Sequence, residues 1–332
     1  SYSAHWASKR SDQCLSWSSI TASERPIERS RLASEESWKS RPSSGLWRSS
    51  GGTSASVLGG RGCLVTSAAS IDDAVGAALV VLAGDALSFL FTWEIMSIVS
   101  FLLVVAEHHD SEVRHAGYFY AAMTHIGTAF IIALFFLLYR YTGRMDFAGM
   151  KAGMAAVPGG VKSAVFIFSV VGFGTKAGII PLHTWIPRAY PAAPTNIAAI
   201  MSGLMVKMGI YGIIRICLDV MGQGPEWWGI ALIATGAVSA LLGILYGVIE
   251  NDMKVFLAYS SVENIGIILL GVGASMMFKS NGLPVLSSLA LVAALYHVVN
   301  HALFKGVLFL GAGSVIHRIR TRNMEEMGGL IR

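Results

Sequence analysis

The chain has 332 residues, of which 54% are hydrophobic and 14% are charged, with a formal net charge of +5. Soluble domains carry about 25% charged residues, so this composition excludes an ordinary soluble domain and indicates a protein surrounded by lipid. The basic residues are scattered among short loops, where they mark helix ends near lipid headgroups rather than a patch that binds nucleic acid.

Residues 1–62 differ from the rest, because they are rich in serine and arginine and have neither a helical nor a strand period. A transit peptide is poor in acidic residues, and Glu24, Glu28, Glu35 and Glu36 count against that interpretation. We expect a non-membrane stretch without function, either a disordered tail or out-of-frame sequence that replaces earlier membrane helices.

Apolar segments then continue without a linker, which predicts one transmembrane domain over residues 63–332. A spanning helix needs about 20 mostly apolar residues. The predicted fold is all-α, a polytopic helical bundle of about seven or eight helices in the cell (inner) membrane. The expected spans are near residues 74–84 (partial), 86–106, 115–139, 163–185, 192–218, 227–249, 255–278 and 285–316.

Ionisable residues within these apolar runs are candidate functional residues, because each costs about 2.5–3.5 kcal/mol at the membrane centre. Glu94 lies within the second expected span, and Lys207 lies in the middle of the fifth. A lysine so far from both helix ends cannot reach the headgroups easily. His125 is expected to form a hydrogen bond between helices.

Lys176 stands five residues before Pro181 in GFGTKAGIIPLHTWIP. Proline removes a backbone donor and disrupts a helix, so Pro181 predicts a helix break near Lys176. Broken backbone at membrane depth is tolerated where it is buried in protein or lines a hydrated cavity, and transporters use such breaks for ion sites. We expect a buried lysine that takes up and releases protons.

Lys254 follows Glu250 and Asp252 at a helix junction, where its side chain is expected to snorkel to the interface. Glu263 lies deeper in the same apolar run and is a further candidate.

His297, His301 and Lys305 follow one another at four-residue steps in LYHVVNHALFKGVLFL. That spacing drifts by only about 40° per step around a helix, so the three side chains form one polar stripe. Histidines four residues apart suit zinc, but no third ligand is apparent. Hydrogen bonding between helices remains an alternative, and a proton relay is favoured because histidine titrates near neutral pH.

The three cysteines, Cys14, Cys63 and Cys217, are isolated, so neither a disulfide framework nor a metal site is expected. The sequence has no nucleotide-binding glycine loop and no iron–sulfur spacing. No cofactor and no catalytic residue is therefore expected in this chain.

Taken together in their order along the chain, these sequence motifs resemble those of the antiporter-like subunits of respiratory complex I, Mrp-type sodium/proton antiporters and membrane-bound hydrogenases. The resemblance covers residues from about 78 to 332. YSSVENIG at 259–266 and MTHIGTA at 123–129 are most similar to the large membrane subunit of formate hydrogenlyase and related group 4 hydrogenases. The motifs that carry the family resemblance are Trp93–Glu94, Lys176 to Pro187, Ala192 to Asn196, Lys207, Asp252 to Ser261, and His297, His301 and Lys305.

The resemblance implies that Glu94 pairs with Lys176, that Lys207 is the next central lysine, and that His297 and His301 bridge onward. A proton would pass along these groups, driven by a redox reaction in a peripheral arm. The partners implied are other membrane subunits and a hydrogenase or dehydrogenase arm, while this chain performs no redox catalysis. The family fold has further helices at both ends, so we expect a chain truncated at both ends.

The resemblance therefore predicts a proton- or cation-translocating subunit of a multi-subunit hydrogenase. A complex I (NADH-quinone oxidoreductase) subunit or an Mrp antiporter subunit is an alternative. A non-conducting fragment that anchors a peripheral complex is another. An unrelated solute transporter would need a substrate pocket.

Overall fold

A computed structural model describes residue 71 and residues 74–328 of the chain. The serine- and arginine-rich stretch, with the expected boundary between residues 62 and 63, lies outside the described residues. Cys14 and Cys63 lie outside them as well.

Regular structure in the described part of the chain is helical, apart from two isolated bridges, Asp85 with Asp146 and Asp252 with Asn323. Residues 74–82 form a helix, as expected for the partial span. The helices that follow are α3 (Ala86–Val104), α4 (Ser111–Thr142), α5 (Phe147–Ala152), η1 (Gly153–Ala156), α6 (Gly159–Ala177), α7 (Ile186–Ala192), α8 (Thr195–Ile200), η2 (Met201–Met205), α9 (Val206–Ile213), η3 (Ile214–Val220), α10 (Glu226–Val248), α11 (Met253–Ser280), α12 (Pro284–Ile319) and η4 (Met324–Glu326).

Seven helical stretches of the described residues are long and apolar enough to cross a membrane. The predicted all-α, multi-pass membrane fold is confirmed. Most spans are those expected, but the run expected at 163–185 ends as a helix at Ala177, and the remainder forms turns before α7.

Aspartates fix where several spans begin. Asp85, Asp110 and Asp252 each accept hydrogen bonds from the first backbone N–H groups of α3, α4 and α11. These N–H groups have no partner within the helix, so an N-terminal carboxylate satisfies them. The caps anchor the helices at the polar edges of the apolar spans.

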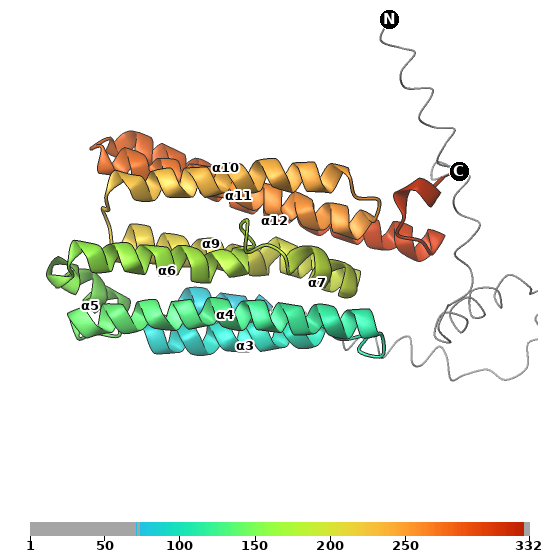
Figure 1. The fold of residues 1–332 in the computed structure, drawn as a ribbon, viewed down its shortest axis with the longest axis horizontal. Helices are drawn as coiled ribbons and strands as arrows, with labels where there is room; N and C mark the ends of the chain where they lie inside the picture. The colour runs from blue at the N-terminus through green and yellow to red at the C-terminus, as the bar shows by residue number, and fades with distance from the viewer. Residues whose placement is uncertain (1–70, 72–73, 329–332) are drawn as a thin grey trace, which may run out of the picture. The chain divides into compact units, whose positions relative to one another are not determined.

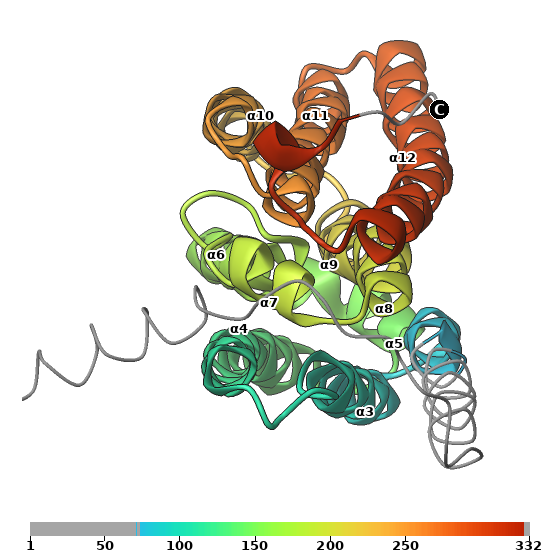
Figure 2. The same ribbon diagram turned by 90° about the vertical axis from the view of Figure 1, so that its right-hand side faces the viewer.

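The helices lie in layers, with the broken helix in the middle (Figures 1 and 2). One outer layer contains α3 and α4, and the other contains α10, α11 and α12. Between them lie α6, α7, α8 and α9. On one side α6 and α7 contact α4, and on the other side α7 contacts α11 and α8 contacts α12. This arrangement places residues of the middle layer against polar residues from either side.

The helix break after Lys176 is confirmed. Gly178 adopts a left-handed conformation (φ 78°) and ends α6, which favours glycine. Backbone groups near the break are satisfied by side chains: Trp185 Nε1 donates to the Thr175 carbonyl at 2.7 Å, and the Ser239 hydroxyl accepts from Ile180 N at 3.0 Å. Gly178 and Ile179 are buried while Pro181 is exposed, so the protein itself supplies hydrogen-bond partners to the broken backbone, as a membrane interior demands.

The span around Lys207 differs from the single regular helix expected over residues 192–218. It begins at Thr195 and is interrupted by two π-helical segments, η2 and η3. π-type turns within α-helices are frequent at functional sites, and η2 directly precedes the turn that carries Lys207.

Candidate functional site

Lys176 lies in the last turn of α6, and its side chain is buried, with 2% of the residue exposed. Its ammonium donates to the Ser97 hydroxyl of α3 at 3.0 Å and to the Tyr120 hydroxyl of α4 at 2.9 Å. It also lies 5.9 Å from the centre of the Trp93 ring. A helix C-terminus and aromatic faces both favour a cation, so three helices build this lysine site.

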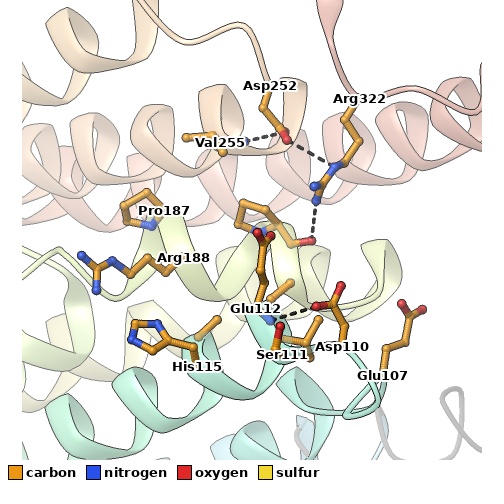
Figure 3. A pocket seen from close by; sticks show the side chains of 14 residues that line it. Glu107, Asp110, Ser111, Glu112, His115, Pro187, Arg188, Asp252, Val255 and Arg322 are labelled. Atoms are coloured by element: carbon orange, nitrogen blue, oxygen red, sulfur yellow. Dashed lines mark hydrogen bonds and ion pairs between the residues drawn. The ribbon is translucent and has the colours of Figure 1, made fainter. Parts of the chain in front are cut away.

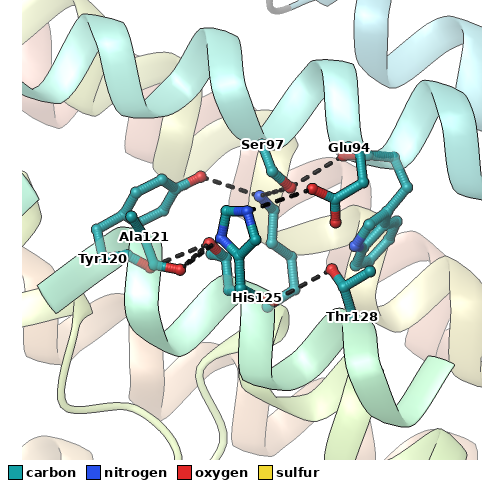
Figure 4. A network of polar contacts seen from close by, with 9 residues as sticks. Glu94, Ser97, Tyr120, Ala121, His125 and Thr128 are labelled. Atoms are coloured by element: carbon teal, nitrogen blue, oxygen red, sulfur yellow. Dashed lines mark hydrogen bonds and ion pairs between the residues drawn. The ribbon is translucent and has the colours of Figure 1, made fainter. Parts of the chain in front are cut away.

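Glu94 lies on α3 one helical turn before Ser97 and faces α4 (Figure 4). Its Oε2 is 3.7 Å from Nε2 of His125. The structure therefore places Glu94 one turn along α3 from Ser97, which donates to the Trp93 carbonyl and accepts from Lys176. The direct pairing of Glu94 with Lys176 stays a prediction.

His125 makes its hydrogen bond within α4, to the Ala121 carbonyl at 2.8 Å. Its contact between helices is the approach to Glu94 rather than the hydrogen bond expected from the sequence. Figure 4 shows His125 and Tyr120 on one helix, facing Glu94 and Ser97 on the other.

Lys207 is buried at the start of α9, and its ammonium donates to the backbone carbonyl of Ser202 in η2. A π-type turn replaces the regular i→i−4 bonding of an α-helix. The Ser202 carbonyl accepts the lysine at the point where that pattern changes. The π segment and the lysine therefore form one local unit.

A hydroxyl pair connects the Lys207 unit to α11. The hydroxyls of Ser202 and Ser261 are 2.9 Å apart, and both residues are fully buried. Ser261 also donates to the Leu257 carbonyl, which accepts the ammonium of Lys305 from α12. A continuous run of hydrogen bonds thus leads from the Ser202 hydroxyl to Lys305.

The predicted polar stripe is present on α12. The rings of His297 and His301 are 6.3 Å apart and nearly parallel, and His301 and Lys305 are fully buried. His297 Nε2 is 3.0 Å from the Asn264 side-chain oxygen of α11. Neither ring nitrogen of His301 has a hydrogen-bond partner among the described residues.

Glu263 is half-buried on α11. Its neighbour Asn264 makes the contact with His297. No cluster of three or more His, Cys, Asp or Glu residues able to hold a metal occurs within the described residues.

The snorkelling expected for Lys254 is wrong. Only 7% of this residue is exposed, and its ammonium donates to the Ala193 carbonyl at 2.9 Å. Ala193 is the C-terminal cap of α7, where carbonyls lack helical partners. Lys254 of α11 therefore caps the second half of the broken helix.

Four residues of this network could not be assigned from the sequence: Ser97, Tyr120, Ser202 and Ser261. Ser97 and Ser261 carried a partial signal, because Ser97 follows Glu94 by one turn and Ser261 lies in the YSSVENIG motif. Tyr120 and Ser202 are ordinary residues of apolar runs, and packing alone gives them their partners.

A polar pocket of about 750 Å³ opens where α4 and α11 begin, beside α7 (Figure 3). Asp252 pairs with Arg322 at 3.3 Å, and Arg322 also donates to the Pro191 carbonyl at 3.1 Å. The pocket lies at helix ends, outside the run of buried lysines and hydroxyls. Its other charged residues are Glu107, Asp110, Glu112 and Arg188.

The family model described as "NADH:quinone oxidoreductase/Mrp antiporter, TM" matches residues 83–332. Hydrogenase-4 component B of Escherichia coli (strain K12) is 47% identical over 248 residues, which are 74% of this chain and 36% of that protein. Formate hydrogenlyase subunit 3 of the same strain is 42% identical over 214 residues, 64% of this chain and 35% of that protein.

A solved structure of the membrane-bound sulfane sulfur reductase, an archaeal respiratory membrane complex, contains a chain of similar fold. The TM-score is 0.67 at 26% identity, covering 77% of this chain and 50% of the other. The present chain spans about a third of the length of the two Escherichia coli relatives.

Proposed function

The chain belongs to the NADH:quinone oxidoreductase/Mrp antiporter transmembrane family, and on that premise we propose that it translocates protons as a membrane subunit of a hydrogenase complex. The observation that carries this proposal is Lys176, a buried lysine at a helix break whose ammonium is held by two hydroxyls. A hydroxyl accepts from a lysine ammonium and can also donate to the lone pair of a neutral amine. The site can therefore accommodate both a charged and a neutral lysine.

The proposed route continues through buried groups of the middle layer and α12. Lys207 lies beyond the break, next to the Ser202–Ser261 hydroxyl pair. Lys305 shares an acceptor with Ser261, and His301 lies between Lys305 and His297 along the stripe. Both lysines donate to backbone carbonyls, of Ser202 and of Leu257, and a carbonyl carries no proton to pass on. A serine hydroxyl both donates and accepts, so the proposed transfer between the two lysine sites uses the hydroxyl pair with a water bridging each ammonium to it.

A hydrogenase complex is the proposed setting because two relatives are named hydrogenase-4 component B and formate hydrogenlyase subunit 3. We propose other membrane subunits and a peripheral redox arm as partners, with the redox reaction located in that arm. A sodium/proton antiporter or NADH-quinone oxidoreductase subunit is the second candidate, since the family description includes both.

The test is proton uptake by membrane vesicles that contain the assembled complex, driven by its own redox substrate. Lys176→Ala is expected to abolish uptake, and the matched control Lys162→Ala, at the other end of α6, to retain it. Subunit content of purified complexes checks assembly. Equal uptake by Lys176→Ala and the wild type would overturn the proposal and favour an anchoring role.

A further inference from the structure

The side chains of His125 on α4 and Glu94 on α3 approach each other across the two helices. Nδ1 of His125 is 2.8 Å from the Ala121 carbonyl oxygen. A carbonyl oxygen only accepts, so Nδ1 must carry a hydrogen. In neutral histidine the other nitrogen, Nε2, is then an acceptor, and it faces the Glu94 carboxylate at 3.7 Å. Two acceptors do not attract one another, so this contact is favourable only when Nε2 of His125 or the Glu94 carboxylate carries a proton.

The location of the pair is the second observation. His125 lies near the middle of the membrane span α4, yet 62% of its side chain is exposed, against 30% for Glu94. Its neighbour Ile126 is 54% exposed on the same helix. An ionisable group at this depth is costly and is retained for a function. Glu94 therefore contacts an exposed histidine of α4 and lies one turn along α3 from Ser97, which accepts from Lys176.

We propose that His125 exchanges a proton with Glu94 and so forms a lateral entry to the Lys176 site; this inference rests on the proposed function. In the step, the Nε2–H bond breaks and an Oε2–H bond forms, so that imidazolium and carboxylate become neutral imidazole and carboxylic acid. The gap must shorten from 3.7 Å to about 2.8 Å, by side-chain rotation or through one water.

The proton on Glu94 then changes the field at Lys176. Ser97, which accepts from Lys176, is one turn away from Glu94 on α3, and the proposal requires the carboxylate charge to act on the ammonium. The titratable groups around the pair, among the described contacts, are Glu94 of α3, Tyr120 of α4 and Lys176 of α6. Neutralising Glu94 favours proton release from Lys176.

The experiment compares proton uptake against pH in vesicles that hold the assembled complex. His125→Gln keeps a polar side chain at an exposed position, and His115→Gln, also exposed on α4, is its matched control. We expect His125→Gln to slow uptake about tenfold or more, as for loss of a positioned proton-transfer group, and to change the dependence of uptake on pH. His115→Gln is expected to match the wild type.

A double-mutant comparison separates a relay from a structural role. Glu94→Gln with His125→Gln is expected to be no slower than the slower single variant, since both interrupt one step. If His125→Gln matches His115→Gln in rate and pH profile while Lys176→Ala abolishes uptake, the lateral entry is wrong and the proposed function stands. If Lys176→Ala also transports normally, the proposed function fails first.

Discussion

The ammonium of Lys305 and the hydroxyl of Ser261 donate to the same oxygen, the backbone carbonyl of Leu257, each at 2.9 Å. This shared acceptor ties α12 to α11 within the apolar interior and accounts for a lysine that is fully buried. Because Ser261 also contacts Ser202, a change at either serine reaches both lysine sites.

The Ser202–Ser261 pair is expected to act as one unit. Ser261→Ala should lower stability by about 1 kcal/mol for the lost hydrogen bond and slow proton uptake about tenfold. Ser202→Ala should behave alike, and the double variant should be no slower than either single one. Vesicle uptake and thermal unfolding of the purified complex measure the two effects.

Ser314→Ala is the control for the serine variants, because Ser314 bonds to its own helix from an exposed position on α12. Multiplied effects in the double variant, as for two independent sites, would contradict a joint role of the two hydroxyls in proton transfer.

The effect of the Lys305 charge on proton uptake can be separated from the effect of its side-chain packing on stability. Lys305→Met keeps the length of the side chain and removes a buried charge, so we expect stability to stay equal or to rise. Uptake is expected to fall about 10²-fold or more without the titrating amine. Lys279→Met, at the end of α11, is the control that should still transport. Normal uptake by Lys305→Met would remove this residue from the route.

Asp85 gives a pH prediction outside the membrane span. Its carboxylate accepts from the Ser88 hydroxyl and from backbone N–H groups of α3, which hold the pKa of Asp85 below its usual value. The pKa of Asp85 in the folded state lies below the unfolded value of about 3.9. The ionised carboxylate therefore contributes to the free energy of unfolding at pH values above the unfolded pKa, and this stabilisation is lost as pH falls through the folded-state pKa. Asp85→Ala should cost about 1 kcal/mol at pH 7.

The difference in melting temperature between wild type and Asp85→Ala should shrink below pH 4, at the acid end of a titration in detergent. Asp85→Asn caps without titrating, so its difference from Asp85→Ala should stay constant with pH. If the difference in melting temperature between the wild type and Asp85→Ala also stayed constant with pH, capping at Asp85 would not depend on the charge of its carboxylate.

The sequence alone was sufficient to predict a feature where a single residue determines the local backbone conformation, or where a regular residue spacing places side chains on one face of a helix. Pro181 predicted the break after Lys176 because proline lacks an N–H wherever it stands. The four-residue spacing predicted the stripe of His297, His301 and Lys305 because helix geometry alone aligns them.

The remaining features depend on packing between distant segments. The π segment before Lys207 has no compositional signature, and Tyr120 gains its lysine only when α4 packs against α6. Lys254 was expected at the interface because its neighbours are charged. It is buried because α11 packs on the end of α7, which offers the Ala193 carbonyl.

Gly209 determines how closely α9 approaches α6, and hence how the two lysine-bearing helices fit together. A Cβ at Gly209 would lie 2.6 Å from Ala177 N and 2.8 Å from Ala177 Cβ, one residue after Lys176. Gly209→Ala must therefore push α9 away from the break, which we expect to cost about 1–3 kcal/mol of stability and most of the proton uptake.

Gly306→Ala on α12, where a Cβ meets nothing within 4 Å, should be neutral or slightly stabilising because alanine favours a helix. Thermal unfolding and vesicle uptake of both variants decide the matter, and a Gly209→Ala complex with wild-type uptake would show that the close contact of α6 with α9 is dispensable for transport.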